Sequence, residues 1–278
     1  SPAAWTGITS LLEKPPTVNC ARPPDDSELV RPQADLDRGK IPHIRVSGPR
    51  DSPRMALRPE AVKQQGKIML RALRKRFGIL GMLGILKDTW ANQRRLRRDY
   101  PETRQKAAAI SDIVEKELFT FSAMFVALAK RLGREEAYDF FKTRVMNEIA
   151  QTSMGLLYQL EDLKQCEGDV FENFKKFNIA MFQRTTRDGT WHMESYTDDP
   201  DKLTITVTTC ANVELFGELG VPELGMFGCD HDLAGYPVIE DDVNCEFRRL
   251  CTIAKGDDRC VFEFYRKGTA PDNAHLNK

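Results

Sequence analysis

The spacing of hydrophobic positions changes about two thirds of the way along the chain. Between residue 59 and Gly189, apolar residues recur every three to four positions, which is the helical period; after Gly189 they alternate with polar residues, which is the strand period. Helices are expected over 59–77, 102–130, 135–158 and 170–182, and strands over 191–196, 203–209, 246–254 and 261–265. The pattern predicts an α+β fold, with a helical N-terminal half packed on a small antiparallel C-terminal sheet of about four strands.

The first predicted helix is basic and amphipathic. Ile68, Met69 and Leu73 lie on one side of it, and Lys67 and Arg71 lie on the other. Such a face contacts solvent more often than an anionic partner. The apolar stretch that follows, 77–86, contains three glycines and is too short to span a membrane, so we expect it to be buried against protein.

Proline content sets the expected domain organisation. Most of the 15 prolines fall before residue 59, in a stretch without periodic apolar residues, which is typical of an extended arm. We therefore expect a Pro-rich arm over 1–58 and a single α+β domain over 59–278, with a helical part over 59–187 and a sheet part over 188–268. The arm is either a flexible terminus or a segment that wraps a neighbouring subunit and makes a homo-oligomer.

Composition narrows the class of partner. The 41 basic and 41 acidic side chains cancel, so no cationic surplus favours nucleic acid or a membrane surface. Seven cysteines, an odd number without a pairing pattern, are not typical of a secreted disulfide framework. With no signal-peptide pattern in the first residues, these features predict a reducing, cytoplasmic compartment.

Thiols and carboxylates gather after the second predicted strand. Cys210 and Glu214 follow that strand directly, and Cys229, His231 and Asp232 come after a turn-rich segment. Loops and short helices at strand ends commonly carry binding and catalytic side chains. The structural alternatives are buried cysteines and carboxylates that cap helices or face solvent.

One set of elements occurs in a fixed order between Tyr196 and Tyr265: Cys210 with Glu214, residues 219–224, Cys229 with Asp232, Arg249 with Thr252, and residues 256–264. In the order and spacing of these elements the sequence resembles the L-2-amino-thiazoline-4-carboxylic acid hydrolase family. The chain departs from the family pattern at Tyr236-Pro237, where a phenylalanine-asparagine pair is usual.

The resemblance implies hydrolytic opening of a small, sulfur-containing cyclic amidine to a carbamoyl-cysteine product, without a cofactor. Two mechanisms remain open. In one, the thiolate of Cys229 or Cys210 attacks the ring carbon while Asp232, Glu214 or His231 moves protons. In the other, thiols with a carboxylate or histidine hold a metal that activates water, although the wide cysteine spacing does not indicate a metal.

Further residues are candidates for binding the substrate. Arg249, Thr252 and Cys260 belong to the last two predicted strands, but a separation of three puts Arg249 and Thr252 on opposite strand faces unless a bulge intervenes. His192 and Glu194 share one face of the first strand, where they either line the cavity or contact solvent.

Two other classes of function fit the same features. A non-catalytic module that binds or senses a small molecule would also use a helical layer, a small sheet and a cysteine-rich pocket. An interaction protein would use the arm and the basic helices from Lys63 to Arg98. Thiol reactivity coupled to turnover distinguishes the enzyme from the binding module.

Overall fold

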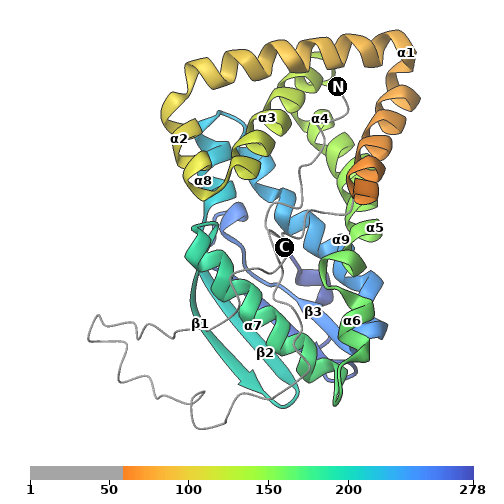
Figure 1. Cartoon of the computed structure of the whole chain (residues 1–278), viewed down its shortest axis with the longest axis vertical. Helices are drawn as coiled ribbons and strands as arrows, with labels where there is room; N and C mark the ends of the chain where they lie inside the picture. Colours follow the sequence, from red (N-terminus) through yellow and green to blue (C-terminus); the bar gives the residue numbers. More distant parts are fainter. Residues whose placement is uncertain (1–58) are drawn as a thin grey trace.

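The computed structural model describes residues 59–278, with side chains from residue 64 onward, so the proline-rich segment and any oligomer contact it makes lie outside the described residues. Helices fill one end of the molecule, and a four-stranded antiparallel sheet covered by α7 (Val170–Asp188) fills the other (Figure 1). The predicted α+β class is confirmed. Over 59–278, no helix combines the length and hydropathy needed to cross a bilayer.

The helical part is broken more often than the periodicity suggests. Its other elements are α1 (Pro59–Asp99), α2 (Pro101–Ile110), α3 (Asp112–Leu132), α4 (Arg134–Phe141), the π-helical turn η4 (Lys142–Met146), α5 (Asn147–Leu157) and α6 (Leu160–Gln165). The single helix expected over 102–130 is wrong, because Ser111 has an extended backbone and its hydroxyl caps α3 by accepting the Val114 N–H at 3.1 Å. The helix end expected at Gly133 is confirmed, with φ of 84°.

Helix α1 bends in its middle, at Gly78, where φ is 67° (Figure 1). Before the bend, Ile68, Met69 and Leu73 are buried, as expected. After it, Leu80 is 85% exposed, so the expected burial of 77–86 is wrong for part of that stretch. One side of α1 packs on α3 and buries Ile85, and this leaves the opposite side of the helix in solvent.

The sheet contains β1 (Trp191–Asp199), β2 (Lys202–Cys210), β3 (Cys245–Arg248) and β4 (Cys260–Arg266), in the order β1-β2-β4-β3 with every pair antiparallel. In β2, Leu203, Ile205 and Val207 are buried, and the residues between them are not. This alternation confirms the predicted strand period.

The third strand ends six residues earlier than expected, at Arg248. The backbone beyond it is bonded elsewhere: the Arg249 N–H donates to Asn277 Oδ1 at 2.8 Å, and the Thr252 N–H donates to Asp257 Oδ2 at 2.6 Å. Because these groups are already paired, the chain leaves the sheet, and both Arg249 and Thr252 become buried. The expectation that they lie on opposite strand faces is therefore wrong.

Helix α9 (Phe227–Val243) connects two hydrophobic clusters. Its first residue, Phe227, belongs to the cluster of the helical part, whereas Tyr236, Ile239 and Val243 belong to the cluster under the sheet. Four short elements complete the sheet part, namely α8 (Ala211–Glu218), η5 (Pro222–Met226), η6 (Ile253–Lys255) and η7 (Ala274–Leu276). The first turns of α9 thus lie where the two cores meet.

Candidate functional site

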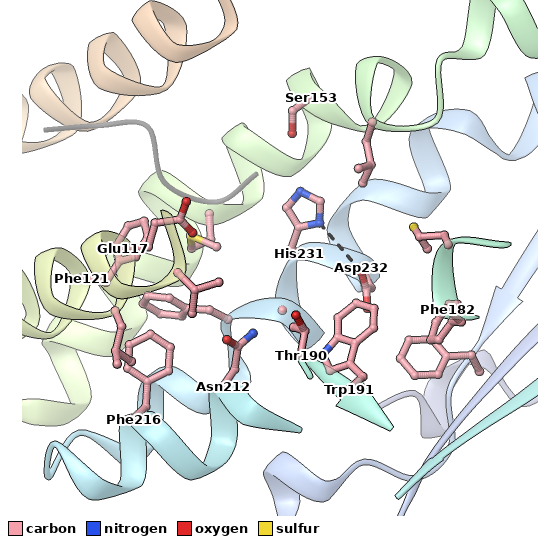
Figure 2. A pocket seen from close by; sticks show the side chains of 18 of the residues that line it. Glu117, Phe121, Ser153, Phe182, Thr190, Trp191, Asn212, Phe216, His231 and Asp232 are labelled. Carbon is pink, nitrogen blue, oxygen red and sulfur yellow. Dashed lines mark ion pairs between the residues drawn. The ribbon is translucent and has the colours of Figure 1, made fainter. Parts of the chain in front are cut away.

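A cavity of about 110 Å³ lies at this junction (Figure 2). Residues from α3, α5, α7, β1, α8, α9 and β4 line it, so both halves of the molecule contribute. One water molecule needs about 10–15 Å³ by the same measure, so the cavity has room for a small molecule rather than a polymer.

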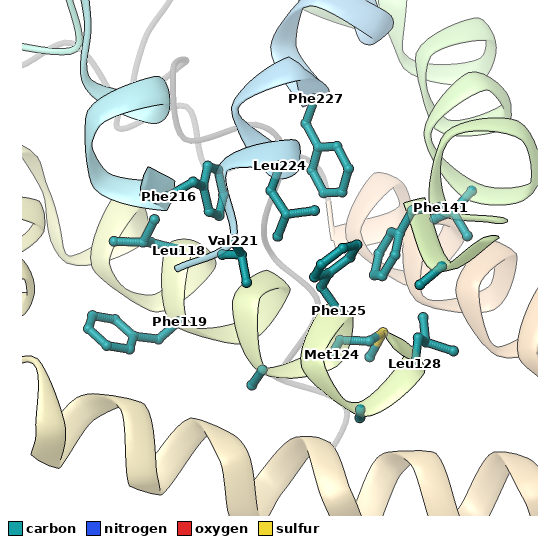
Figure 3. Close-up of a cluster of buried hydrophobic side chains, with 14 of the residues drawn as sticks. Leu118, Phe119, Met124, Phe125, Leu128, Phe141, Phe216, Val221, Leu224 and Phe227 are labelled. Atoms are coloured by element: carbon teal, nitrogen blue, oxygen red, sulfur yellow. The ribbon is translucent and has the colours of Figure 1, made fainter. Parts of the chain in front are cut away.

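Apolar side chains form most of the cavity wall. On the helical side, Leu118, Phe216 and Phe227 line the cavity and also belong to the helical core (Figure 3). On the sheet side, the ring of Phe182 lies 5.3 Å from that of Trp191 and 4.9 Å from that of Phe262. Flat aromatic faces of this kind suit a small ring as ligand.

Among the described residues, three ionisable groups other than tyrosine line the cavity: Glu117 from α3, and His231 and Asp232 from α9. His231 is buried, and its Nδ1 lies 3.9 Å from Asp232 Oδ1, as the dashed line in Figure 2 marks. The pair belongs to the segment in which thiol and carboxylate chemistry is predicted from sequence. A histidine beside a carboxylate can accept and return a proton.

Arg249 fixes the position of Asp232. Its guanidinium donates from one amino nitrogen to Asp232 Oδ2 at 2.8 Å and from the other to the backbone oxygen of Cys229 at 2.7 Å. It also donates to the backbone oxygen of Lys278, at 3.1 Å. Arg249 is 1% exposed, and burial is the largest influence on its pKa and lowers it; the charge and hydrogen bond of Asp232, together with Cys229 and Cys260, outweigh burial and leave the pKa raised. Arg249 therefore remains cationic and holds one carboxylate oxygen in place.

Two cysteines and a threonine lie behind this ion pair. Thr252 Oγ1 is 3.2 Å from Cys229 Sγ and 3.3 Å from Cys260 Sγ. Burial raises the pKa of the Cys229 thiol, although Arg249 and the Thr252 hydrogen bond lower it. None of the three residues lines the cavity. Cys229 is thus held as a neutral thiol near the site, without facing the space a ligand would fill.

Cys210 and Glu214 do not line the cavity either. Burial raises the pKa of Cys210 to about 12. Hydrogen bonds from the backbone N–H groups of Val213 and Asn212 favour the thiolate, but they offset only part of this rise. The Glu214 side chain is 63% exposed, and its Oε1 lies 3.3 Å from Lys106 Nζ. The structure therefore does not bring these two residues together with His231 and Asp232.

On the first strand, the two halves of the alternation have different surroundings. His192 and Glu194 are exposed, and Glu194 approaches Arg259 at 4.0 Å. Trp191 and Met193 point inward, and Trp191 lines the cavity. The face of β1 that points inward therefore carries Trp191 and Met193. The candidate residues His192 and Glu194 lie on the opposite face, in contact with solvent.

Sequence reasoning missed the tyrosine pair on the cavity wall. The hydroxyls of Tyr158 and Tyr236 are hydrogen-bonded to each other, and the Tyr158 hydroxyl also donates to Asn178 Oδ1 at 3.0 Å. Burial raises the pKa of both tyrosines well above the usual value, with the Asp232 charge adding to it, so both stay protonated. The available signal was Tyr236 itself, since it occupies the position at which this chain departs from the family pattern.

The sequence leaves open whether the site holds a metal ion. Across residues 59–278, the structure has no group of three or more histidine, cysteine, aspartate or glutamate side chains placed to hold a metal ion. The carboxylate and thiols near the cavity are instead engaged with Arg249 and Thr252.

Comparison with known proteins identifies the segment that carries the site. Searches of curated proteins and of solved structures give no match. A sequence model of the L-2-amino-thiazoline-4-carboxylic acid hydrolase family matches residues 111–264, which is more than half of the chain and includes α3, α9 and all four strands except the end of β4. The chain therefore belongs to the L-2-amino-thiazoline-4-carboxylic acid hydrolase family.

Proposed function

We propose that this protein hydrolyses a small cyclic amidine, opening the ring between its central carbon and a ring sulfur or nitrogen. The observation that carries the proposal is the cavity at the junction of the two cores, whose wall presents His231 beside an Asp232 held by buried Arg249. A largely apolar cavity with a few fixed polar groups is the usual form of a small-molecule site. Membership of a hydrolase family supports the reaction type.

His231 and Asp232 have different roles in the proposed reaction. A water molecule in the cavity gives a proton to the His231 imidazole as its oxygen attacks the amidine carbon, and the Asp232 carboxylate beside Nδ1 stabilises the imidazolium that forms. The tetrahedral carbon then expels the ring heteroatom, which takes the proton from His231. One water is consumed, one ring bond breaks and nothing is oxidised. For a 2-amino-thiazoline, cleavage of the C–S bond leaves a urea and a free thiol.

Water is favoured over a cysteine as the nucleophile. The Cys229 sulfur is engaged with Thr252, its pKa is raised by burial, and it does not line the cavity. An attacking thiol needs its pKa lowered and an unobstructed path to the substrate. The raised pKa of Cys210 makes it a poorer candidate still.

The test is a ring-opening assay on the purified full chain. It uses a panel of 2-amino-thiazolines, cyclic amides and lactones, with products identified by mass spectrometry and thiol release followed with a chromogenic thiol reagent. Elemental analysis of the same sample establishes its metal content. We expect one ring of the amidine type to open with release of a thiol or an amine. Binding of such rings without any turnover would replace the enzyme with a binding module.

A further inference from the structure

Helix α1 carries a concentration of exposed apolar side chains. Of the nine large hydrophobic residues that are exposed between residues 64 and 278, five belong to this helix: Leu70, Ile79, Leu80, Leu83 and Trp90. Leu80, two residues after the bend at Gly78, is 85% exposed. Single exposed apolar residues are normal on a protein surface, whereas a row of them on one helix is typical of an interaction site.

Three of these residues form a stripe on the outer side of α1. Ile79, Leu83 and Trp90 are separated by four and seven positions, so they share one helical face. The opposite face carries the buried Ile85 and packs on α3. In Figure 1 this part of α1 runs across the end of the molecule that is furthest from the sheet. The stripe therefore lies along an outer edge of the molecule.

The same helix has a local surplus of positive charge. Between residues 67 and 98 it holds ten lysine or arginine side chains and one acidic side chain, Asp88, which pairs with Arg131 of α3. Four of the ten cations pair with carboxylates. The other six are exposed and have no carboxylate partner among residues 64–278: Lys67, Arg74, Lys75, Lys87, Arg94 and Arg95. The zero net charge of the whole chain therefore does not extend to α1, whose surface is cationic.

The cations lie beside the apolar stripe and at both of its ends. The guanidinium of Arg94 lies 4.7 Å from the centre of the Trp90 ring, which places a positive charge directly over the end of the stripe. A hollow of about 500 Å³ lies at the bend of α1, and four cations with two apolar residues line it: Lys67, Leu70, Arg71, Arg74, Lys75 and Met82. Clustered lysine and arginine donors of this kind bind phosphate groups.

These groups match a lipid surface better than a protein partner. A second copy of the chain would bring cations opposite cations, because Lys75 precedes the stripe and Arg94 follows it, whichever way the two helices run. A stable complex with an acidic protein draws on roughly 20–30 residues from each side. Shallow insertion into lipid needs only a few exposed apolar side chains with cations beside them, which is what one face of α1 offers.

We propose that the outer face of α1 binds the surface of a bilayer that contains anionic lipids. The helix lies in the plane of the membrane, with Ile79, Leu83 and Trp90 at the boundary between headgroups and acyl chains and the unpaired cations against lipid phosphates. This mode of binding requires no helix that crosses the bilayer, and none is found over residues 59–278. Because no residue of α1 lines the cavity, membrane binding is independent of the proposed ring-opening reaction.

Vesicle flotation of the full chain tests the proposal. Phosphatidylcholine vesicles that contain about 30% phosphatidylserine are compared with vesicles of phosphatidylcholine alone, at about 0.15 M salt. We expect the chain to bind the phosphatidylserine vesicles at least about 10-fold more tightly, and this preference to disappear at about 1 M salt, where charges are screened within about 3 Å. Equal binding to both kinds of vesicle at the lower salt, or binding to neither, overturns the proposal.

Paired variants assign the binding to α1. Leu80→Gln with Leu83→Gln, and Arg94→Gln with Arg95→Gln, should each weaken binding to the phosphatidylserine vesicles by about 10-fold or more. Val238→Gln in α9 removes an exposed apolar side chain elsewhere and should leave binding within about 2-fold of the wild type.

Circular dichroism of each variant establishes that it is folded. Undiminished vesicle binding in both α1 double variants overturns the proposal. Self-association of the wild-type chain that is lost in the Leu80→Gln, Leu83→Gln variant, without binding to vesicles, also overturns it and assigns the stripe to a second copy of the chain.

Discussion

Replacing Arg249 with methionine removes the guanidinium that binds Asp232 and two backbone oxygens, and keeps most of the side-chain volume. The wild-type guanidinium serves three acceptors, Asp232 Oδ2 at 2.8 Å and the backbone oxygens of Cys229 at 2.7 Å and Lys278 at 3.1 Å. In the variant a carboxylate that is only 20% exposed loses its counter-ion, and two carbonyls lose donors. Breaking a buried ion pair in this way costs about 3–5 kcal/mol, so we expect a loss of that size in the free energy of unfolding.

Equilibrium denaturation in urea measures this loss, provided that the dependence on urea is unchanged between variants. In an Asp232→Asn background the same substitution should cost at least about 1 kcal/mol less, because no bare carboxylate remains. Arg259→Met is a matched control, since Arg259 pairs with Asp258 on the surface; it should leave the unfolding midpoint nearly unchanged. A loss below about 1 kcal/mol for Arg249→Met would refute the reasoning.

Three further predictions follow from the same contacts. Iodoacetamide should modify Cys229 slowly at pH 7 in the folded protein, because burial raises the pKa of this thiol; peptide mapping that finds rapid alkylation would restore Cys229 as a nucleophile. The pKa of Cys210 is about 12 in the folded protein against an ordinary 9.0, so the protonated thiol contributes stability below pH 9 that is lost as the pH rises toward 12. Cys210→Ala should therefore reduce the fall of the unfolding free energy with rising pH in this range. An unchanged slope would contradict the prediction. Gly225→Ala should destabilise the protein by about 1–3 kcal/mol, because the added Cβ would lie 3.2 Å from the Val213 Cα. A Cβ at Gly217 in α8 meets nothing within 4 Å, so Gly217→Ala should be neutral or stabilising. Thermal unfolding that ranks the two variants the other way would contradict this packing.

The fold could be predicted from the sequence wherever the periodicity acts locally. Alternation fixes Leu203, Ile205 and Val207 as the inward set of β2, and the glycine at 133 marks the end of α3. The end of β3 could not be predicted in this way. It depends on Asn277 binding the backbone of Arg249, a contact across 28 positions that leaves no pattern in the strand itself.

The sequence could predict which segment of the chain carries the site, but not which other residues surround it. Side-chain chemistry and the family resemblance point to His231 and Asp232, and both residues line the cavity. Their apolar surroundings come from residues that periodicity can assign only to a core, such as Leu118 and Phe182. Whether a core residue faces a cavity or a neighbouring side chain depends on how two separate clusters meet. No single helix or strand records that arrangement.

The most direct test of the account is the kcat/KM of four variants on the ring that the wild type opens fastest. His231→Gln and Asp232→Asn should each lower it by about 100-fold or more, the usual contribution of a positioned acid-base group, with folding verified by circular dichroism. Cys229→Ala and Glu214→Gln should keep it within about 3-fold of the wild type, because neither residue lines the cavity. Full activity in His231→Gln together with loss of activity in Cys229→Ala would contradict the account and make the thiol the nucleophile.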